Sequence, residues 1–264
     1  MLPRTGLIHT EHADYLLFLT GDFITNEIYK TGGWDQITQQ ITQMLYSGVE
    51  APLVLDIGAN LGSFSVPIAK DLLARGGEVI AFEPQEIIYY QLCANIVLNR
   101  LDNLTAYNKA VGNYNGEIDI PKIDYHHNPN TGAFSFIKQY RERGFIEHAM
   151  KEDLTTVPML KLDSLKLKKS PTVIKMDVEG YELDVFKGAC QFLAEHHYPT
   201  ILLEIWNVDY YLERRQELMT FIQSLGYDLF SHNDNDYIAQ HQSHARKLIF
   251  SEPSKGTFQI TWND

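Results

Sequence analysis

Acidic residues stand at the ends of several short apolar runs in this 264-residue chain. Asp56, Glu83, Asp177 and Glu204 each lie at the end of such a run, and Glu179 follows two positions after Asp177. Carboxylates at the carboxyl ends of parallel strands meet at one edge of a sheet, where like charges and partial burial perturb their pKa values. We therefore expect Asp177, Glu179 and Glu204 to form a functional acidic rim.

A glycine-containing turn follows the first apolar run, from Asp56 to Gly62. Glycine lets the backbone turn sharply and lets a ligand approach without a Cβ in the way. The helix expected next would offer free N–H groups and a partial positive charge. The dinucleotide fingerprint G-x-G-x-x-G would need glycine where Asn60 and Ser63 stand, and no Gly-Lys-Ser/Thr follows. The turn therefore fits a dinucleotide or a P-loop phosphate poorly.

Glu83 ends the second apolar run, just before Pro84. A carboxylate at this place can accept hydrogen bonds from both ribose hydroxyls of a nucleoside ligand. The alternative is an exposed acid beside a helix start. For Glu182, we favour a structural role, as a charge in the first turn of a helix.

The order of apolar runs and helical periodicities predicts an α/β fold with a doubly wound, mostly parallel sheet. The expected strands are 53–57, 78–83, 104–108, 172–177, 200–205, 227–230 and 237–240. The expected helices are 34–45, where Ile37, Ile41 and Leu45 make an apolar stripe, 63–73, 84–99, 181–195 and 213–225.

The chain divides into an N-terminal helical extension or cap at 1–50 and a ligand-binding domain at 51–264. Within that domain, residues 121–155 have no sustained period, and long loops in compact domains commonly act as lids or binding segments. We expect this stretch to be a variable lid or acceptor loop.

The composition disfavours several classes of protein. The formal charge is −12, from 34 acidic and 22 basic residues, and such a surface repels a phosphate backbone. We therefore expect no nucleic acid as a partner. We also expect no membrane, since no apolar run approaches the ~20 residues of a transmembrane helix. Cys93 and Cys190 are expected to be reduced, and without a secretory signal we expect a soluble, cytoplasmic protein.

Three segments resemble motifs of the FkbM family of methyltransferases, and the resemblance runs from about Trp34 to Gln240. These segments are Val54–Gly62, Phe82–Pro84 and, the most distinctive, Val173–Leu183, with Leu162–Leu165 matching a shorter motif before it. The resemblance implies a class I, Rossmann-like methyltransferase that uses S-adenosylmethionine. Such enzymes typically methylate hydroxyls of sugars, polyketides or other secondary metabolites, so the implied acceptor is a small molecule or glycan.

The resemblance also implies roles for individual residues. Gly58, Asn60 and Gly62 would wrap the methionine end of the donor, with Asp56 beneath. Glu83 would bind the ribose. The backbone near Ala110 would flank the adenine, and Asp177 would lie beside the methionine moiety.

Methyl transfer to an aliphatic hydroxyl requires alignment of the reactants and a base near the acceptor oxygen. Glu179 and Glu204 are the candidate bases, and we expect Asp177, Glu179 and Glu204 to be the catalytic residues. His126 or His127 is a weaker candidate for the base. We expect no metal at this site, so that the carboxylates act directly on the acceptor. The alternative is that the three carboxylates hold Mg²⁺ through oxygen ligands.

Three other functions remain open on the residues alone. A nicotinamide-dependent oxidoreductase would share the sheet but conflicts with Asn60 and Ser63. A non-catalytic S-adenosylmethionine-binding module would bind the donor without turnover. A protein or RNA methyltransferase is disfavoured by the acidic composition and by the lack of an Asn-Pro-Pro-Tyr-like motif after the fourth strand. The sequence does not identify the acceptor, the pathway or the oligomeric state.

Overall fold

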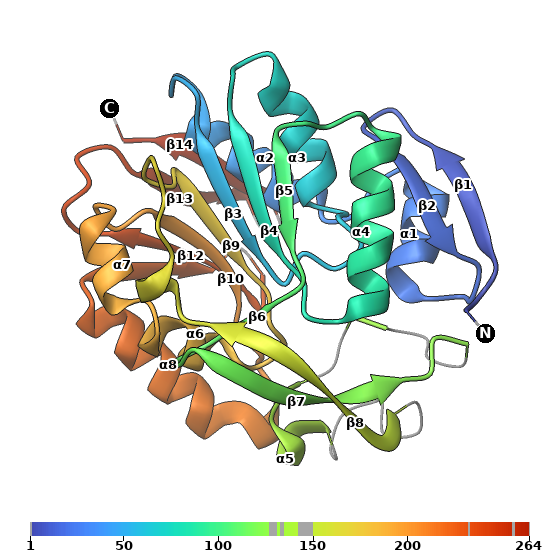
Figure 1. The fold of residues 1–264 in the computed structure, drawn as a ribbon. Coiled ribbons are helices and arrows are strands. Elements are labelled where there is room, and N and C mark those ends of the chain that lie inside the picture. The colour runs from blue at the N-terminus through green and yellow to red at the C-terminus, as the bar shows by residue number, and fades with distance from the viewer. Residues whose placement is uncertain are drawn as a thin grey trace.

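The centre of the molecule is a seven-stranded sheet (Figure 1). The structure is a computed structural model that describes residues 2–126, 131–132, 135–141, 150–231, 233–254 and 257–263. The strand order is β11-β12-β10-β9-β3-β4-β5. Their bounds are β3 Leu53–Ile57, β4 Glu78–Phe82, β5 Leu104–Tyr107, β9 Val173–Met176, β10 Thr200–Glu204, β11 Tyr227–Ser231 and β12 Asp236–His241.

The sheet is mostly parallel and reverses its winding direction once. β3 pairs in parallel with both β4 and β9, and only β12 runs antiparallel to its neighbours β10 and β11. The chain passes from β3 outward to β4 and β5, then returns to place β9 and β10 on the other side. The doubly wound α/β fold is therefore confirmed, with its switch point at the carboxyl ends of β3 and β9, the place where such sheets bind ligands.

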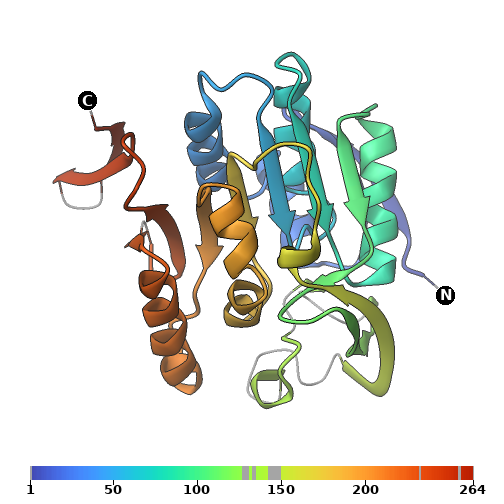
Figure 2. The same ribbon diagram turned by 60° about the vertical axis from the view of Figure 1, so that its left-hand side comes forward.

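Helices cover both faces of the sheet and enclose two separate cores (Figure 2). Alternate residues of one strand enter different cores, Val54 one and Leu55 the other, as the two-residue period of a strand requires. The first face carries α1 Phe23–Thr31, α2 Gln36–Tyr46, α3 Ser65–Leu73 and α4 Glu86–Leu98. The second carries α6 Glu182–Lys187, α7 Cys190–Glu195 and α8 Leu212–Ser224, the last preceded by the 3₁₀ turn η3 Asp209–Tyr211.

The N-terminal extension is not purely helical as expected, because it begins with a β-hairpin. Strands β1 Thr5–His9 and β2 Asp14–Phe18 pair antiparallel, ahead of α1 and α2. The side chains of Asn95 in α4 and of Asn99 at its C-cap accept hydrogen bonds from backbone N–H groups of β2, so the hairpin is fastened to the main domain. The expected stripe of α2 also needs correction: Ile37 is 57% exposed, whereas Ile41 and Leu45 are buried.

Residues 121–155 are not one continuous loop. β7 Gly116–Ile123 and β8 Met150–Leu160 pair antiparallel, so both ends of the expected loop belong to strands. The pairing includes Pro121 with Leu154 and Ile123 with Met150, and β8 also pairs with β6 Ala110–Val111. Pro121 interrupts the alternation of the Ile118–Ile123 stretch, so the sequence pattern does not carry the strand beyond Ile120. Between the strands lies the short helix α5 Lys138–Arg141.

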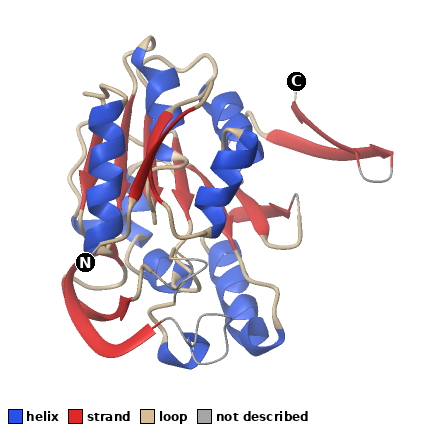
Figure 3. Cartoon of the chain, turned by 90° about the vertical axis from the view of Figure 1, so that its right-hand side faces the viewer, coloured by secondary structure: helices blue, strands red, loops and turns tan. Residues whose placement is uncertain are grey.

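The helix expected over 181–195 is two helices, broken at Gly188. A Cβ on Gly188 would lie 2.0 Å from the Gly112 carbonyl oxygen, so the close backbone approach at the break requires glycine. Beyond the sheet, β13 Leu248–Ser254 and β14 Thr257–Trp262 form a C-terminal hairpin that extends from the body (Figure 3). The 3₁₀ turn η2 Leu162–Ser164 precedes β9, and both cysteines are free thiols. None of the helices in the described part combines the length and apolar character needed to cross a membrane.

Candidate active site

The turn from Gly58 to Gly62, called here the glycine turn, lies at the switch point. Gly58 has φ of +86°, and a Cβ on it would lie 1.8 Å from the backbone carbonyl oxygen of Asp177. The backbone N–H groups of Gly58 and Ala59 both donate to the carbonyl of Phe82 in β4. Asn60 also has a positive φ, of 51°, and its side chain accepts a hydrogen bond from the N–H of Leu61. Glycine at 58 is thus required by close packing as well as by backbone conformation.

Glu83 is buried at the end of β4 and organises the glycine turn. One carboxylate oxygen accepts a hydrogen bond from the N–H of Asn60 at 2.9 Å, and the other accepts one from the N–H of Gln85 at 2.8 Å. Burial raises the pKa of Glu83 to about 7, against the opposing effect of these two hydrogen bonds. A carboxylate has about four lone-pair sites, so each oxygen keeps the capacity to accept one more hydrogen bond. The contacts exclude the exposed-acid alternative.

Replacing Glu83 by Ala is expected to weaken binding of S-adenosylhomocysteine by about 2 kcal/mol, the scale of a lost charge-assisted hydrogen bond. The expected loss has two sources, since the variant would remove the predicted acceptor for the ribose and would free the N–H of Asn60. Calorimetric titration of the variant and the parent measures the effect. The exposed Glu86 of the next helix supplies the control, as Glu86→Ala removes the same charge at the start of α4. An unchanged affinity in Glu83→Ala would mean that the ribose binds elsewhere.

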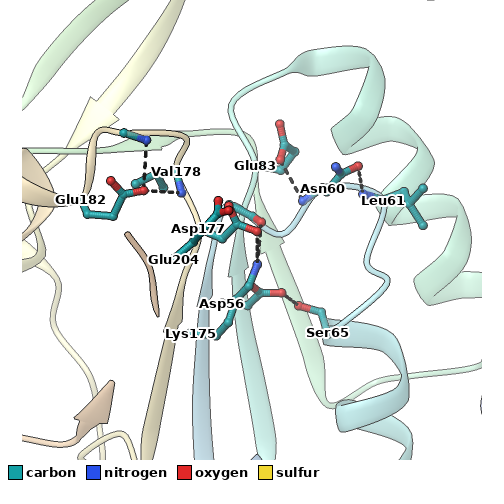
Figure 4. Close-up of polar contacts among 12 residues, drawn as sticks. Asp56, Asn60, Leu61, Ser65, Glu83, Lys175, Asp177, Val178, Glu182 and Glu204 are labelled. Carbon is teal, nitrogen blue, oxygen red and sulfur yellow. Dashed lines mark hydrogen bonds and ion pairs between the residues drawn. The ribbon is translucent and has the colours of Figure 1, made fainter. Parts of the chain in front are cut away.

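Asp56 is fully buried beneath the glycine turn (Figure 4). Its Oδ2 accepts a hydrogen bond from the hydroxyl of Ser65, and its Oδ1 lies 3.5 Å from Nζ of Lys175. A side chain with 0% exposure has no surface to offer a ligand. Asp56 therefore acts on a bound molecule only through the residues that it holds.

The structure brings Asp177, Glu179 and Glu204 together, and we call these three the acidic rim. One carboxylate oxygen from each lies within 4.8 Å of those of the other two, and all three side chains are partly exposed. Burial, followed by the charge of Asp177, raises the pKa of Glu204 to about 8. Burial also raises the pKa of Glu179 well above its ordinary value, with the charges of Asp177 and Glu204 adding to the effect.

Local contacts and backbone conformation position two members of the acidic rim, Glu179 and Glu204. Glu179 has a left-handed backbone conformation, φ 56°, in the turn after β9. The indole N–H of Trp206 donates to Glu204 at 3.2 Å. Three carboxylate oxygens at this spacing can stabilise a cationic ligand or accept a proton, and they are also the ligand type that Mg²⁺ prefers.

Glu182 lies in the first turn of α6, as its position suggested, but its side chain is buried and hydrogen-bonded. It is 1% exposed, and one carboxylate oxygen accepts hydrogen bonds from the backbone N–H groups of Val178 and Gly180. The hydroxyl of Tyr211 donates to the other oxygen. Glu182 therefore fixes the turn that carries Glu179, and burial raises its pKa to about 7.

The other candidates lie farther from these contacts or outside the described residues. Ala110 is buried in β6, opposite Met159 of β8, where its backbone takes part in the three-stranded sheet. His126 is exposed at the end of the β7 segment. His127 lies outside the described residues, as does part of the 121–155 segment.

The sequence interpretation missed Lys175. Its Nζ contacts three oxygens of the switch point, and its side chain is only 12% exposed. A signal was present, because a lysine between Ile174 and Met176 in an apolar strand needs a carboxylate partner to be buried. Asp35, which caps α2, was also missed; together with Lys175, Asp177, Glu204 and Asp236 it lines a cavity beneath α2.

Comparison with known proteins gives one family and several similar chains. Residues 56–229 match the model of the methyltransferase FkbM domain. The methyltransferase sdnD of Sordaria araneosa is 23% identical over 207 residues, which cover 67% of this chain and 74% of that protein.

Two solved structures are also similar. One is the methyltransferase FkbM from Methylobacillus flagellatus, with 20% identity and a TM-score of 0.46 over 74% of this chain; the match spans 46% of that protein, about half its length. The other is a SAM-dependent O-methyltransferase from Thermotoga maritima, with 11% identity and a TM-score of 0.46 over 97% of this chain and 71% of that one. At such scores these likenesses identify no residue and no substrate of this chain.

Proposed function

Since this chain belongs to the FkbM methyltransferase family, we propose that it transfers a methyl group from S-adenosylmethionine to a hydroxyl oxygen of a small molecule or glycan. The observation that carries the proposal is the convergence of Asp177, Glu179 and Glu204 next to the glycine turn. The arrangement supports the proposal because these candidate proton acceptors lie beside the turn that would hold the donor.

The residues present fit S-adenosylmethionine as the methyl donor. The donor carries a positively charged sulfonium and an ammonium group, and acidic side chains surround the switch point. Bound there, it would supply an activated methyl group together with its own leaving group. Gly58, Asn60 and Gly62 would hold its methionine end, and Asp177 would accept hydrogen bonds from it. Glu83 would receive the ribose hydroxyls, and the backbone near Ala110 would flank the adenine.

The chain's own contribution to the reaction is alignment and proton acceptance. The residues that line the site would orient the acceptor hydroxyl toward the methyl group of the donor, as transfer requires. Glu179 or Glu204 then accepts a hydrogen bond from that hydroxyl and takes its proton as the new bond forms. The described parts of the 121–155 segment would bound the acceptor side of the site, together with the N-terminal segment, whose Asp22 accepts a hydrogen bond from the N–H of Thr131.

An acceptor screen tests the proposal. The protein is incubated with S-adenosylmethionine and panels of sugars, polyketide alcohols, amines and carboxylic acids, and release of S-adenosylhomocysteine is measured. We expect release with a hydroxylated compound and a new O-methyl signal in the product. Methylation of nitrogen or carbon would show that the acceptor atom is not a hydroxyl oxygen. Donor binding without turnover on any panel would favour a non-catalytic module.

The rate should depend on pH in a specific direction. A base acts only in its ionised form, and the pKa of Glu204 in the free protein is raised to about 8. The value of kcat/KM for the donor should therefore increase with pH up to about 8 and then level off. In the donor-bound protein the nearby positive charge lowers the pKa, so the rise in kcat should occur at lower pH. Profiles that are flat between pH 6 and 9 would remove Glu204 as the base.

A further inference from the structure

Three oxygen atoms surround the ammonium group of Lys175 (Figure 4). Nζ donates to the carbonyl oxygen of Gly58 at 3.2 Å and to Oδ2 of Asp177 at 3.4 Å. It also lies 3.5 Å from Oδ1 of Asp56. Nζ of Lys175 therefore makes two hydrogen bonds and one ion pair, the ion pair being the contact to Asp56.

Lys175 stays charged in this environment. Burial disfavours the ammonium form, but the charges of Asp56 and Asp177 outweigh burial and raise the pKa of Lys175. The ring of Phe64 lies 5.9 Å from Nζ and contributes a cation–π contact. Asp35, Glu204 and Asp236 line the same cavity and add negative charge around it.

The three partners of Lys175 belong to the two halves of the switch point. Gly58 begins the glycine turn after β3, while Asp177 follows β9, and the two already touch through the backbone. The contacts of Lys175 therefore hold the glycine turn and the Asp177 carboxylate in a fixed position relative to each other. Because Oδ2 of Asp177 faces the lysine, Oδ1 is the oxygen left for another partner.

We propose that Lys175 is a positioning residue for the methyl donor, which holds the glycine turn and Asp177 in the geometry that receives the donor's methionine end. The inference rests on the proposed function, because it takes the donor to bind at this switch point. Lys175 itself need not touch the donor.

The test is calorimetric titration with S-adenosylhomocysteine, together with donor and acceptor KM values. We expect Lys175→Met to weaken S-adenosylhomocysteine binding by about tenfold or more, on the scale of a lost charged hydrogen bond, and to raise the donor KM more than the acceptor KM. Lys175→Arg keeps the charge and should recover part of the affinity. Lys169→Met is the matched control, because Lys169 pairs with Glu78 at the opposite end of the strands and should leave binding unchanged.

A second variant separates positioning from folding. Lys175→Met leaves the buried Asp56 carboxylate without its cation, which alone can unfold a protein. The double variant Asp56→Asn/Lys175→Met removes that charge, and we expect it to fold and still bind S-adenosylhomocysteine weakly. Asp56→Asn alone keeps the contacts of Lys175 to Gly58 and Asp177, so we expect it to bind S-adenosylhomocysteine more tightly than the double variant does.

The outcomes distinguish the inference from the proposed function. If the parent protein binds S-adenosylhomocysteine and a folded Lys175→Met binds it equally well, the positioning role is wrong and the proposed function stands. Equal losses in the donor and acceptor KM values, with no recovery in Lys175→Arg, would also overturn it. If the parent protein itself does not bind S-adenosylhomocysteine, the proposed function fails first.

Discussion

Replacing Glu179 or Glu204 by Gln is expected to reduce turnover by about 10²–10⁴-fold in at least one of the two variants, while donor affinity is retained. The substitution keeps the shape of the side chain and removes its ability to accept a proton. Turnover is measured with an acceptor from the screen, and donor affinity by calorimetry on the same preparations. Glu213→Gln, which removes an exposed charge from α8, serves as the control. If both variants keep near-normal rates, the acidic rim has no catalytic role.

Chelation completes this test. Activity that survives EDTA assigns the three carboxylates to direct catalysis, as the account expects. Activity that disappears with EDTA and returns with Mg²⁺ would instead make Asp177, Glu179 and Glu204 a metal site, for which their oxygens are suitably close.

Gly58→Ala is expected to be the most destabilising small substitution in the site, at about 4 kcal/mol or more. The added Cβ would lie 1.8 Å from the Asp177 carbonyl oxygen, and the backbone φ of +86° is unfavourable for alanine. In a chain of this size we expect the melting temperature to fall by about 10 °C or more.

Gly48→Ala is the matched control for this variant. Gly48 has nearly the same backbone conformation, φ +82°, but nothing lies within 4 Å of the Cβ that alanine would add. Its cost should be only the backbone strain, about 1 kcal/mol. Equal melting temperatures for the two variants would mean that the glycine turn and Asp177 do not pack as closely as described.

Much of the fold follows from local sequence patterns. Buried parallel strands are continuous apolar runs, so 53–57 and 200–205 were predicted within one residue of β3 and β10. The switch point followed from the order of strands and helices, and with it the meeting of Asp177, Glu179 and Glu204 at one edge. A strand-end position is enough to place a side chain at the correct edge of the sheet.

The rest depended on contacts between distant segments, which a local pattern does not contain. The roles of Lys175 and Glu182 follow from partners on other elements, Gly58 for one and Tyr211 for the other. The glycine at 188 is required by the close approach of the distant Gly112 carbonyl. The N-terminal hairpin is also fastened by side chains of Asn95 and Asn99, at sequence separations of 79 and 85 residues.

Calorimetric titration of the unmodified protein with S-adenosylhomocysteine, and separately with NAD, determines whether the chain binds the proposed methyl donor. We expect saturable binding of S-adenosylhomocysteine at one site per chain, binding of S-adenosylmethionine at the same site, and no binding of NAD. Binding of NAD, with no heat from either S-adenosyl compound, would contradict this expectation and point to a dinucleotide-dependent enzyme on the same type of sheet.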